Sequence, residues 1–161
     1  MAETHKIRPM LWFDGQAEEA AKFYVSLFPN SKILEVTRFG EIGPGPKGSV
    51  MTVAFRLGDQ EFVGLNGGPQ FKFSEAISMA IEVESQAEVD RLWKALTSGG
   101  GEEGQCGWLK DRWGLSWQVV PSALIRAVSS PDQKKAERVM AAVMDMKKID
   151  LARIEAAAAG R

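Results

Sequence analysis

The sequence is short of the residues that build most metal sites. It contains one histidine, His5, and one cysteine, Cys106. Histidine-rich and cysteine-rich metal sites need several such ligands, so the composition excludes them. One cysteine also cannot form a disulfide within the chain. Carboxylates remain as metal ligands, and they favour harder cations such as Mg²⁺ and Ca²⁺.

Strong net charge and long apolar runs are lacking as well. The formal net charge is −1, with 25% charged and 45% hydrophobic residues. This balance gives no reason to expect binding to nucleic acid or to an anionic membrane. No apolar run approaches the roughly 20 residues of a membrane span. The first ten residues lack the apolar core of a signal peptide, which predicts a cytoplasmic protein.

The expected order of elements is β-α-β-β-β, and it occurs twice. Apolar spacing and turn residues first predict a strand, a helix, a strand and a hairpin, at 7–13, 16–28, 32–39 and 50–66. The second series has a strand at 76–83 and a helix at 86–96. Three strands follow: a weak one near Gly104, one that begins at 106 or 108 and ends at 111, and one at 115–120.

The two halves also resemble each other residue by residue. The segment FDGQAEEAAKFYVSLF (13–28) matches VESQAEVDRLWKALTS (83–98), and Tyr24 and Leu27 correspond to Trp93 and Leu96. A spacing this long indicates a duplicated supersecondary unit, because solenoid repeats span roughly 20–50 residues. We therefore predict an α+β domain over 1–128, made of modules 6–67 and 76–121.

Residues 129–161 differ from both modules and predict a C-terminal helical extension. Ser130-Pro131-Asp132 is typical of a helix start. An apolar stripe follows at Val139, Val143, Met146 and Ile149, and Asp150 is positioned to cap a second helix. The stripe predicts packing on the chain's own sheet or on a partner subunit.

Three segments carry a resemblance to a known family: PMLWFDGQAEEAAKFYVSLFPNSKI (9–33), CGWLKDRWGLSWQVVP (106–121) and SSPDQKKAERVMAAVMDMKKIDLARIEAA (129–157). The chain resembles the glyoxalase/bleomycin-resistance/dioxygenase (vicinal oxygen chelate) superfamily. Within it the chain is similar to the PhnB-like group described as 3-demethylubiquinone-9 3-methyltransferase. The resemblance implies two βαβββ modules that form a cup-shaped mixed sheet, and a homodimer.

The resemblance also implies where metal ligands would lie. They fall on Pro9, on Gly64 or Asn66, on Ser78 and on Gln118. Proline and glycine have no ligating side chain, and serine and a neutral amide are weak ligands. We therefore expect no metal and no other cofactor, which leaves no Lewis acid for the superfamily's usual chemistry.

The methyltransferase description implies an S-adenosylmethionine site. The glycine loop FGEIGPGPKG (39–48) imitates one, but the strand-like residues 49–53 follow it. A glycine loop that does not open a helix offers a ligand no helix N-terminus. We predict a structural hairpin loop there.

The resemblance implies that the strand faces carrying Pro9, Ser78 and Gln118 look into the cup, and strand alternation then assigns their neighbours. On the first strand we predict that Leu11 and Phe13 face the cup, and that Met10 and Trp12 face the helix. We predict that Trp117 is core and that Trp113 packs in a turn, and we leave Trp108 as wall or core. Cys106 is either a nucleophile or a small buried residue. The predicted pocket consists of Pro9, Leu11, Phe13, Asn66, Ser78, Cys106, Trp108, Lys110 and Gln118.

Such a lining is apolar with a few neutral polar groups, which suits a planar or apolar small molecule. We predict a metal-independent small-molecule-binding protein. The alternative is an enzyme: either a methyltransferase or a divalent-metal enzyme that uses other carboxylates. A scaffold without a ligand is a third possibility.

Overall fold

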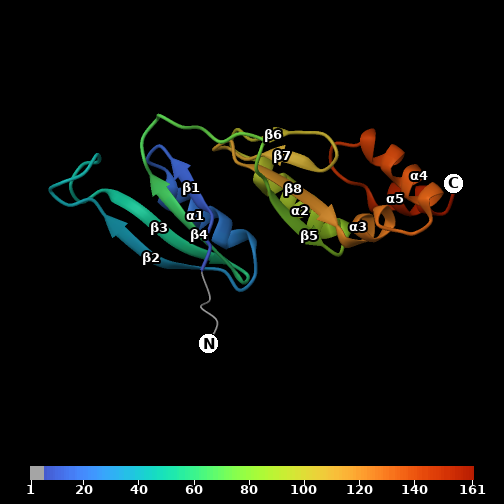
Figure 1. The fold of residues 1–161 in the computed structure, drawn as a ribbon, viewed down its shortest axis with the longest axis horizontal. Coiled ribbons are helices and arrows are strands. Elements are labelled where there is room, and N and C mark those ends of the chain that lie inside the picture. The colour runs from blue at the N-terminus through green and yellow to red at the C-terminus, as the bar shows by residue number, and fades with distance from the viewer. Residues whose placement is uncertain (1–5) are drawn as a thin grey trace. The chain divides into compact units, whose positions relative to one another are not determined.

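The computed structural model describes residues 6–161, so His5 lies outside the described part of the chain. The chain divides into two compact units, Met1–Lys72 and Phe73–Arg161. We call them the N-terminal and C-terminal units and describe each by itself (Figure 1). The division falls in the segment between the two predicted modules.

The N-terminal unit is a four-stranded mixed sheet with one helix. Its elements are β1 (Met10–Phe13), α1 (Ala17–Leu27), β2 (Lys32–Arg38), β3 (Val50–Leu57) and β4 (Gln60–Asn66). The strand order is β1-β4-β3-β2. β1 runs parallel to β4, and the other neighbours are antiparallel.

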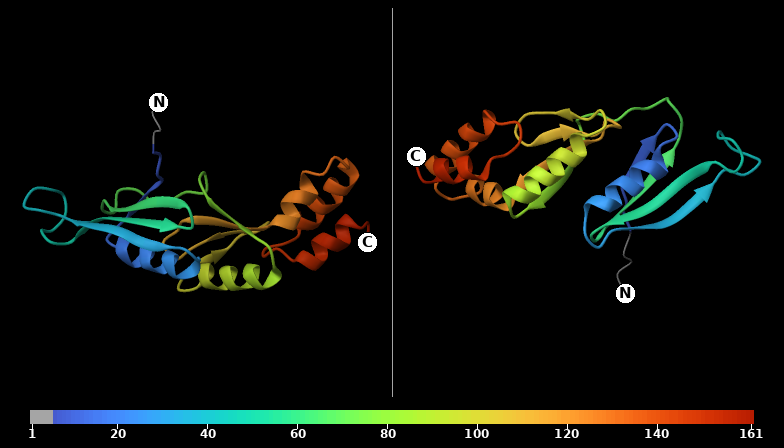
Figure 2. Two further views of the ribbon diagram at one scale, coloured as in Figure 1. Left: turned by 90° about the horizontal axis from the view of Figure 1, so that it is seen from below. Right: turned by 180° about the vertical axis from the view of Figure 1, so that it is seen from behind.

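Helix α1 covers one face of this sheet, as Figure 2 shows. It buries Ala17, Ala20, Ala21 and Tyr24 completely. The Tyr24 ring packs 6.1 Å from the ring of Phe55 on β3. Small residues on the rest of the helix face let the backbone approach the sheet closely.

The C-terminal unit repeats the same arrangement. Its elements are β5 (Met79–Val83), α2 (Gln86–Thr97), β6 (Glu102–Glu103), β7 (Trp108–Lys110) and β8 (Ser116–Pro121), in the sheet order β5-β8-β7-β6. Each strand holds the position of its counterpart in the first sheet, and β5 runs parallel to β8. The predicted α+β fold with two βαβββ modules is confirmed.

Helix α2 starts at a cap that the sequence specifies. The Ser85 side chain accepts a hydrogen bond from the backbone N–H of Glu88, which satisfies one donor of the first turn. The helix buries Val89, Leu92, Trp93 and Leu96. Trp93 is therefore buried like its repeat partner Tyr24 in α1.

Three helices complete the C-terminal unit: α3 (Ser122–Val128), α4 (Gln133–Met144) and α5 (Leu151–Ala158). The cap at Asp150 and the buried stripe agree with the prediction. Helix α4 starts two residues later than Ser130-Pro131-Asp132 indicated, because Asp132 caps it by accepting from the N–H of Lys135. Helix α3 was not predicted. The stripe packs against α3 in a cluster that contains Leu124, Ala127 and Ile154. The apolar stripe thus finds its partners within this unit.

The extension is attached to the sheet through the backbone. The N–H groups of Cys106 and Gly107 donate to the carbonyls of Met146 and Lys147, both at 2.7 Å. Within residues 6–161, no helix is both long and apolar enough to cross a membrane.

Candidate functional site

The C-terminal sheet has one face covered by α2 and one face turned away from it. Trp117 and Val119 on β8 are 3% and 0% exposed and pack on the α2 side. Neighbouring residues on a strand point to opposite faces. The opposite face, which we call the open face, carries Ser78, Ala80, Trp108, Lys110, Ser116 and Gln118.

Register and a hydrogen bond bring the predicted polar residues of this face together. Gln118 lies opposite Trp108 on β7 and opposite Ala80 on β5. The Gln118 Nε2 donates to Ser78 Oγ at 2.9 Å. The predicted placement of Ser78, Gln118, Trp108 and Lys110 on one face agrees with the structure, and their contact with a ligand stays a prediction.

A hollow of about 180 Å³ adjoins the open face. Its lining includes Glu75, Glu102, Trp108, Lys110 and Ser116. The Ser116 side chain is 1% exposed, and its Oγ has no hydrogen-bond partner among the described residues. Sequence reasoning did not select Ser116, although its position two residues before Gln118 places it on the same face.

An ion pair borders this hollow. The Lys110 ammonium contacts the Glu75 carboxylate, and both side chains are partly exposed. The hydrogen bond from Lys110 lowers the pKa of Glu75, and the same bond raises the pKa of Lys110. Both groups therefore stay charged across the neutral range.

Asp111 organises the turn that aligns β7 with β8. It is 3% exposed, and its Oδ1 accepts from the backbone N–H groups of Trp113 and Leu115, at 2.9 and 3.0 Å. Its Oδ2 accepts from Trp117 Nε1 at 2.9 Å. The prediction that Trp117 is core is confirmed. Asp111 holds the turn in place through these three hydrogen bonds. The next residue, Arg112, lies over the Trp113 ring, 5.2 Å from its centroid.

On β1 the predicted orientation is wrong. Leu11 and Phe13 are 5% and 3% exposed. Leu11 pairs with Gly64, where an added Cβ would meet Ala17 of α1 and the Phe13 ring. Both side chains therefore point toward α1, and Met10, 61% exposed, points away.

Pro9 and Asn66 serve the backbone of the N-terminal unit. Pro9 precedes β1, and its carbonyl accepts from the N–H of Val63. Asn66 Oδ1 accepts from the Ala17 N–H at 2.9 Å, and its Nδ2 donates to the Val50 carbonyl at 3.0 Å. Asn66 thus caps α1 from the end of β4, a long-range role that local sequence does not reveal.

Cys106 lies in the turn before β7 and does not continue the alternation of that strand. Its φ is 59°, a left-handed conformation that redirects the side chain. Its Sγ lies 3.9 Å from Met144 Sδ, and the residue packs against the cluster of the C-terminal helices. The prediction that Cys106 shares a wall with Trp108 is wrong.

The residues at the implied metal positions do not fit a divalent ion. Pro9 and Gly64 have no ligating side chain, and a Cβ added at Gly64 would meet Ala17 of α1. Ser78 and Gln118 are neutral and hydrogen-bond to each other. In residues 6–161, no cluster of three or more histidine, cysteine, aspartate or glutamate side chains is arranged to hold a metal.

The family model described as 3-demethylubiquinone-9 3-methyltransferase matches residues 5–120. The chain belongs to this family. The matched range of this 3-demethylubiquinone-9 3-methyltransferase family covers the first βαβββ module and all but the last residue of the second. It ends before α3, so the tail segment 129–157, which contributed to the resemblance, lies outside the match.

Several solved structures are similar to this chain. The PhnB protein from Bacillus cereus is 35% identical, with a TM-score of 0.67, and the match covers 73% of this chain and 100% of that one. Protein PA1353 from Pseudomonas aeruginosa is 22% identical, with a TM-score of 0.61, over 73% and 98% of the two chains. A glyoxalase/bleomycin resistance protein from Albidiferax ferrireducens is 16% identical, with a TM-score of 0.47, over 71% and 95%. A comparison with curated proteins finds no match.

Proposed function

We propose that this protein binds a small molecule without a metal, on the open face of the C-terminal sheet. The observation that carries the proposal is the Ser116 hydroxyl, which is buried beside the hollow and has no partner among the described residues. A buried hydroxyl without a hydrogen bond costs about 1–3 kcal/mol. A ligand atom that bonds to Ser116 would recover this energy.

The neighbours of Ser116 indicate the chemistry of the ligand. Trp108 is half-buried in the lining of the hollow and offers an indole surface. A planar apolar ring packs well against such a surface. On the same open face, outside the lining of the hollow, Gln118 and Ser78 supply neutral hydrogen-bonding groups. Lys110, which lines the hollow, is already paired with Glu75. We therefore propose a planar, largely apolar molecule with one or two polar groups.

The second candidate is the methyl transfer that the family description implies. Residues 39–48 lead directly into β3, so this glycine loop does not open a helix. It offers no helix N-terminus to the anionic end of S-adenosylmethionine. This argues against methyl transfer through that loop. Binding of S-adenosylmethionine distinguishes the two candidate functions experimentally.

The test is an NMR titration of ¹⁵N-labelled protein with 1-naphthol, a planar probe with one hydroxyl, and separately with S-adenosylmethionine. We expect 1-naphthol to shift the amide signals of β7 and β8 saturably. Cyclohexylmethanol, which is not planar, should bind more weakly. Ser116→Ala should weaken naphthol binding about fivefold, because one hydrogen bond contributes roughly 1 kcal/mol.

Ser129→Ala is the matched control, because the Ser129 hydroxyl bonds to the Ile125 carbonyl on α3 and does not line the hollow. It should leave the naphthol affinity unchanged. Saturable binding of S-adenosylmethionine with no response to 1-naphthol would overturn the proposal in favour of methyl transfer.

We also propose that the protein is a homodimer, as the superfamily resemblance implies, and that it is cytoplasmic, as the lack of a signal-peptide core in its first ten residues predicts. Sedimentation equilibrium on the purified chain tests the dimer. A single species of twice the 17.6 kDa chain mass is expected, and a monomer at all concentrations would contradict it.

A further inference from the structure

A second, larger hollow lies at one end of the N-terminal sheet. Its volume is about 440 Å³, within the range of small-molecule sites. Three stretches line it: residues 14–18 at the start of α1, residues 39–50 around the glycine loop, and residues 66–70 after β4. We call it the sheet-end hollow. It belongs to the N-terminal unit alone and is separate from the open face.

One wall is fixed by Asn66, which lines the sheet-end hollow. Its amide joins the first N–H of α1 to the carbonyl of Val50, where β3 starts. One side chain therefore holds the ends of three elements at fixed positions. A wall held in this way needs no reorganisation when a ligand binds.

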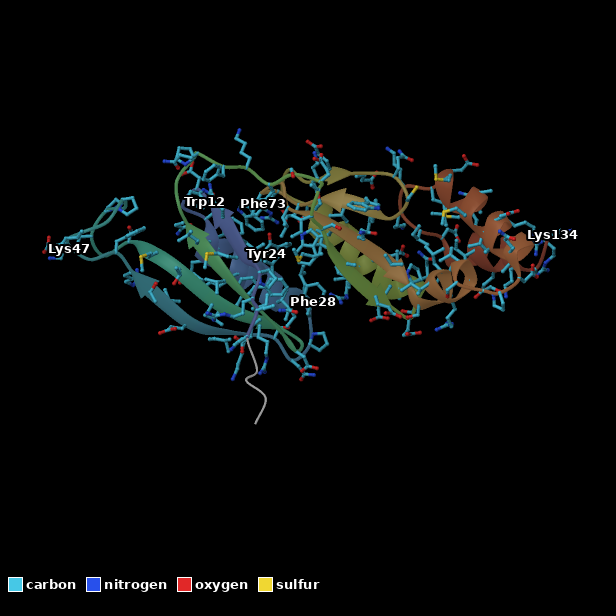
Figure 3. The ribbon with its side chains drawn as sticks, in the orientation of Figure 1. Trp12, Tyr24, Phe28, Lys47, Phe73 and Lys134 are labelled. Carbon is cyan, nitrogen blue, oxygen red and sulfur yellow. The ribbon has the colours of Figure 1, made fainter. Side chains whose placement is uncertain are left out.

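The segment that follows β4 is held by Trp12. Its Nε1 donates to the Gly68 carbonyl at 2.8 Å, and its ring meets Phe71 edge-on at 4.9 Å. Figure 3 labels Trp12 beside this segment. A Cβ on Gly67 would stand 2.3 Å from the indole, so only glycine allows this close approach.

The glycine loop supplies another part of the lining and packs around Phe39. The ring is 8% exposed, and a Cβ on Gly45 would come within 2.3 Å of it. The N–H of Phe39 donates to Ser49, and the N–H of Gly48 donates back to Phe39. Lys47 lies at the outer end of the loop (Figure 3) and is absent from the lining.

The charge of the lining has one sign. Its charged residues are Asp14 and Glu18, and both are acidic. The N-terminus of α1 contributes only about half a positive charge. Lys22, one turn further along α1, places its ammonium group 3.0 Å from the Glu18 carboxylate. Even if Lys22 neutralises Glu18 fully, the charge of Asp14 exceeds that of the helix end.

We propose that the sheet-end hollow binds a small organic cation. The carboxylates of Asp14 and Glu18 would face its ammonium group. Its apolar part would contact Phe39, Val50 and Pro69 in the lining. Protonated amines and quaternary ammonium compounds carry both features, and the volume admits a molecule with one aromatic ring.

The test is an NMR titration of the full chain with benzyltrimethylammonium, with benzyl alcohol as the uncharged probe. We expect saturable shifts confined to residues 14–18, 39–50 and 66–70. Asp14→Asn should weaken binding about fivefold, because one charge at about 4 Å in water contributes roughly 1 kcal/mol. Glu19→Gln removes a neighbouring acid that does not line the hollow, and it should have no effect.

Two glycine variants test the shape of the hollow. Gly45→Ala forces the Phe39 ring to move, and it should weaken binding of the cation by more than Asp14→Asn does. Gly40→Ala adds a Cβ into open space and should leave binding unchanged. The proposal is overturned if benzyl alcohol binds as tightly as the cation, or if Glu19→Gln weakens binding as much as Asp14→Asn. Absence of any saturable shift in the three segments would also overturn it.

Discussion

Asp111 is the polar residue on which the turn before β8 depends. Its carboxylate accepts two backbone N–H groups and the Trp117 indole N–H in a buried setting. Asp111→Asn keeps the size but replaces one acceptor by an N–H₂ donor. We expect the free energy of unfolding to fall by about 2–3 kcal/mol, measured by urea denaturation.

Asp59→Asn is the control for this variant, because Asp59 is exposed in the turn between β3 and β4. It should change the free energy of unfolding by less than about 0.5 kcal/mol. Equal effects of the two substitutions would show that the buried hydrogen bonds of Asp111 contribute nothing to stability.

Ser116 gives a prediction of the opposite sign. Because its buried hydroxyl makes no hydrogen bond to a described residue, Ser116→Ala removes a polar group without removing a bond. We expect the free energy of unfolding of the ligand-free protein to rise by about 1 kcal/mol, in urea denaturation. A fall of that size would mean that the hydroxyl is already satisfied in the protein without a ligand.

Glu75 provides a pH test. Lys110 lowers the pKa of Glu75, so the ion pair stabilises the fold above the usual glutamate range and is lost as pH falls through the lowered pKa. In Lys110→Gln the pKa of Glu75 should rise toward its ordinary value, which an NMR titration of the carboxyl carbon measures. Lys94→Gln, on α2, should not change it. An unchanged pKa in Lys110→Gln would show that the pair does not form in solution.

The strands also show where sequence alternation predicts orientation and where it fails. On β8, Ser116 and Gln118 alternate with apolar residues, so the two faces are distinguishable from the sequence. On β1 the residues are Met-Leu-Trp-Phe, and no polar residue marks one face. Alternation alone then allows either phase, and the phase that the resemblance implies from Pro9 puts Leu11 and Phe13 on the wrong face.

At the scale of elements, the extension should stabilise the unit to which it is attached. Ile149 is 0% exposed, and its carbonyl accepts from the Gln86 side chain of α2. Ile149→Ala leaves a cavity and should lower the free energy of unfolding by about 2–5 kcal/mol, measured by urea denaturation. Met140→Ala, at a site 46% exposed, should cost less than about 1 kcal/mol. Similar costs for both would contradict this packing.

The elements that the sequence predicted correctly carry local signals. α2 has a capping serine and four buried positions at helical spacing, and the repeat at 13–28 and 83–98 reflects two equivalent sheets. Helix α3 was missed because it has seven residues and follows β8 directly, without a turn. Asn66 caps α1 from a distant strand, and Asp111 accepts from backbone N–H groups within its own turn. Hydrophobic periodicity encodes neither contact.

At the scale of the whole molecule, two hollows with different linings share one chain. The hollow of the C-terminal unit has an indole wall, a buried hydroxyl, three glutamates and one lysine, whereas the charged residues that line the sheet-end hollow are Asp14 and Glu18 alone. The two sheets share one strand order but carry different side chains around their hollows. The family match ends at residue 120, one residue before the end of β8, so the C-terminal helices lie outside it.

The central claim is that the open face binds a small molecule without a metal. The most direct measurement follows the indole N–H signal of Trp108 while 1-naphthol is added to ¹⁵N-labelled protein, with a chelator and then with excess Mg²⁺. We expect the same saturable shift in both conditions. The Trp117 signal should stay in place, because that indole N–H is bonded to buried Asp111. A Trp108 signal that does not move, or that moves only when Mg²⁺ is present, would show that the open face does not bind the probe without a metal.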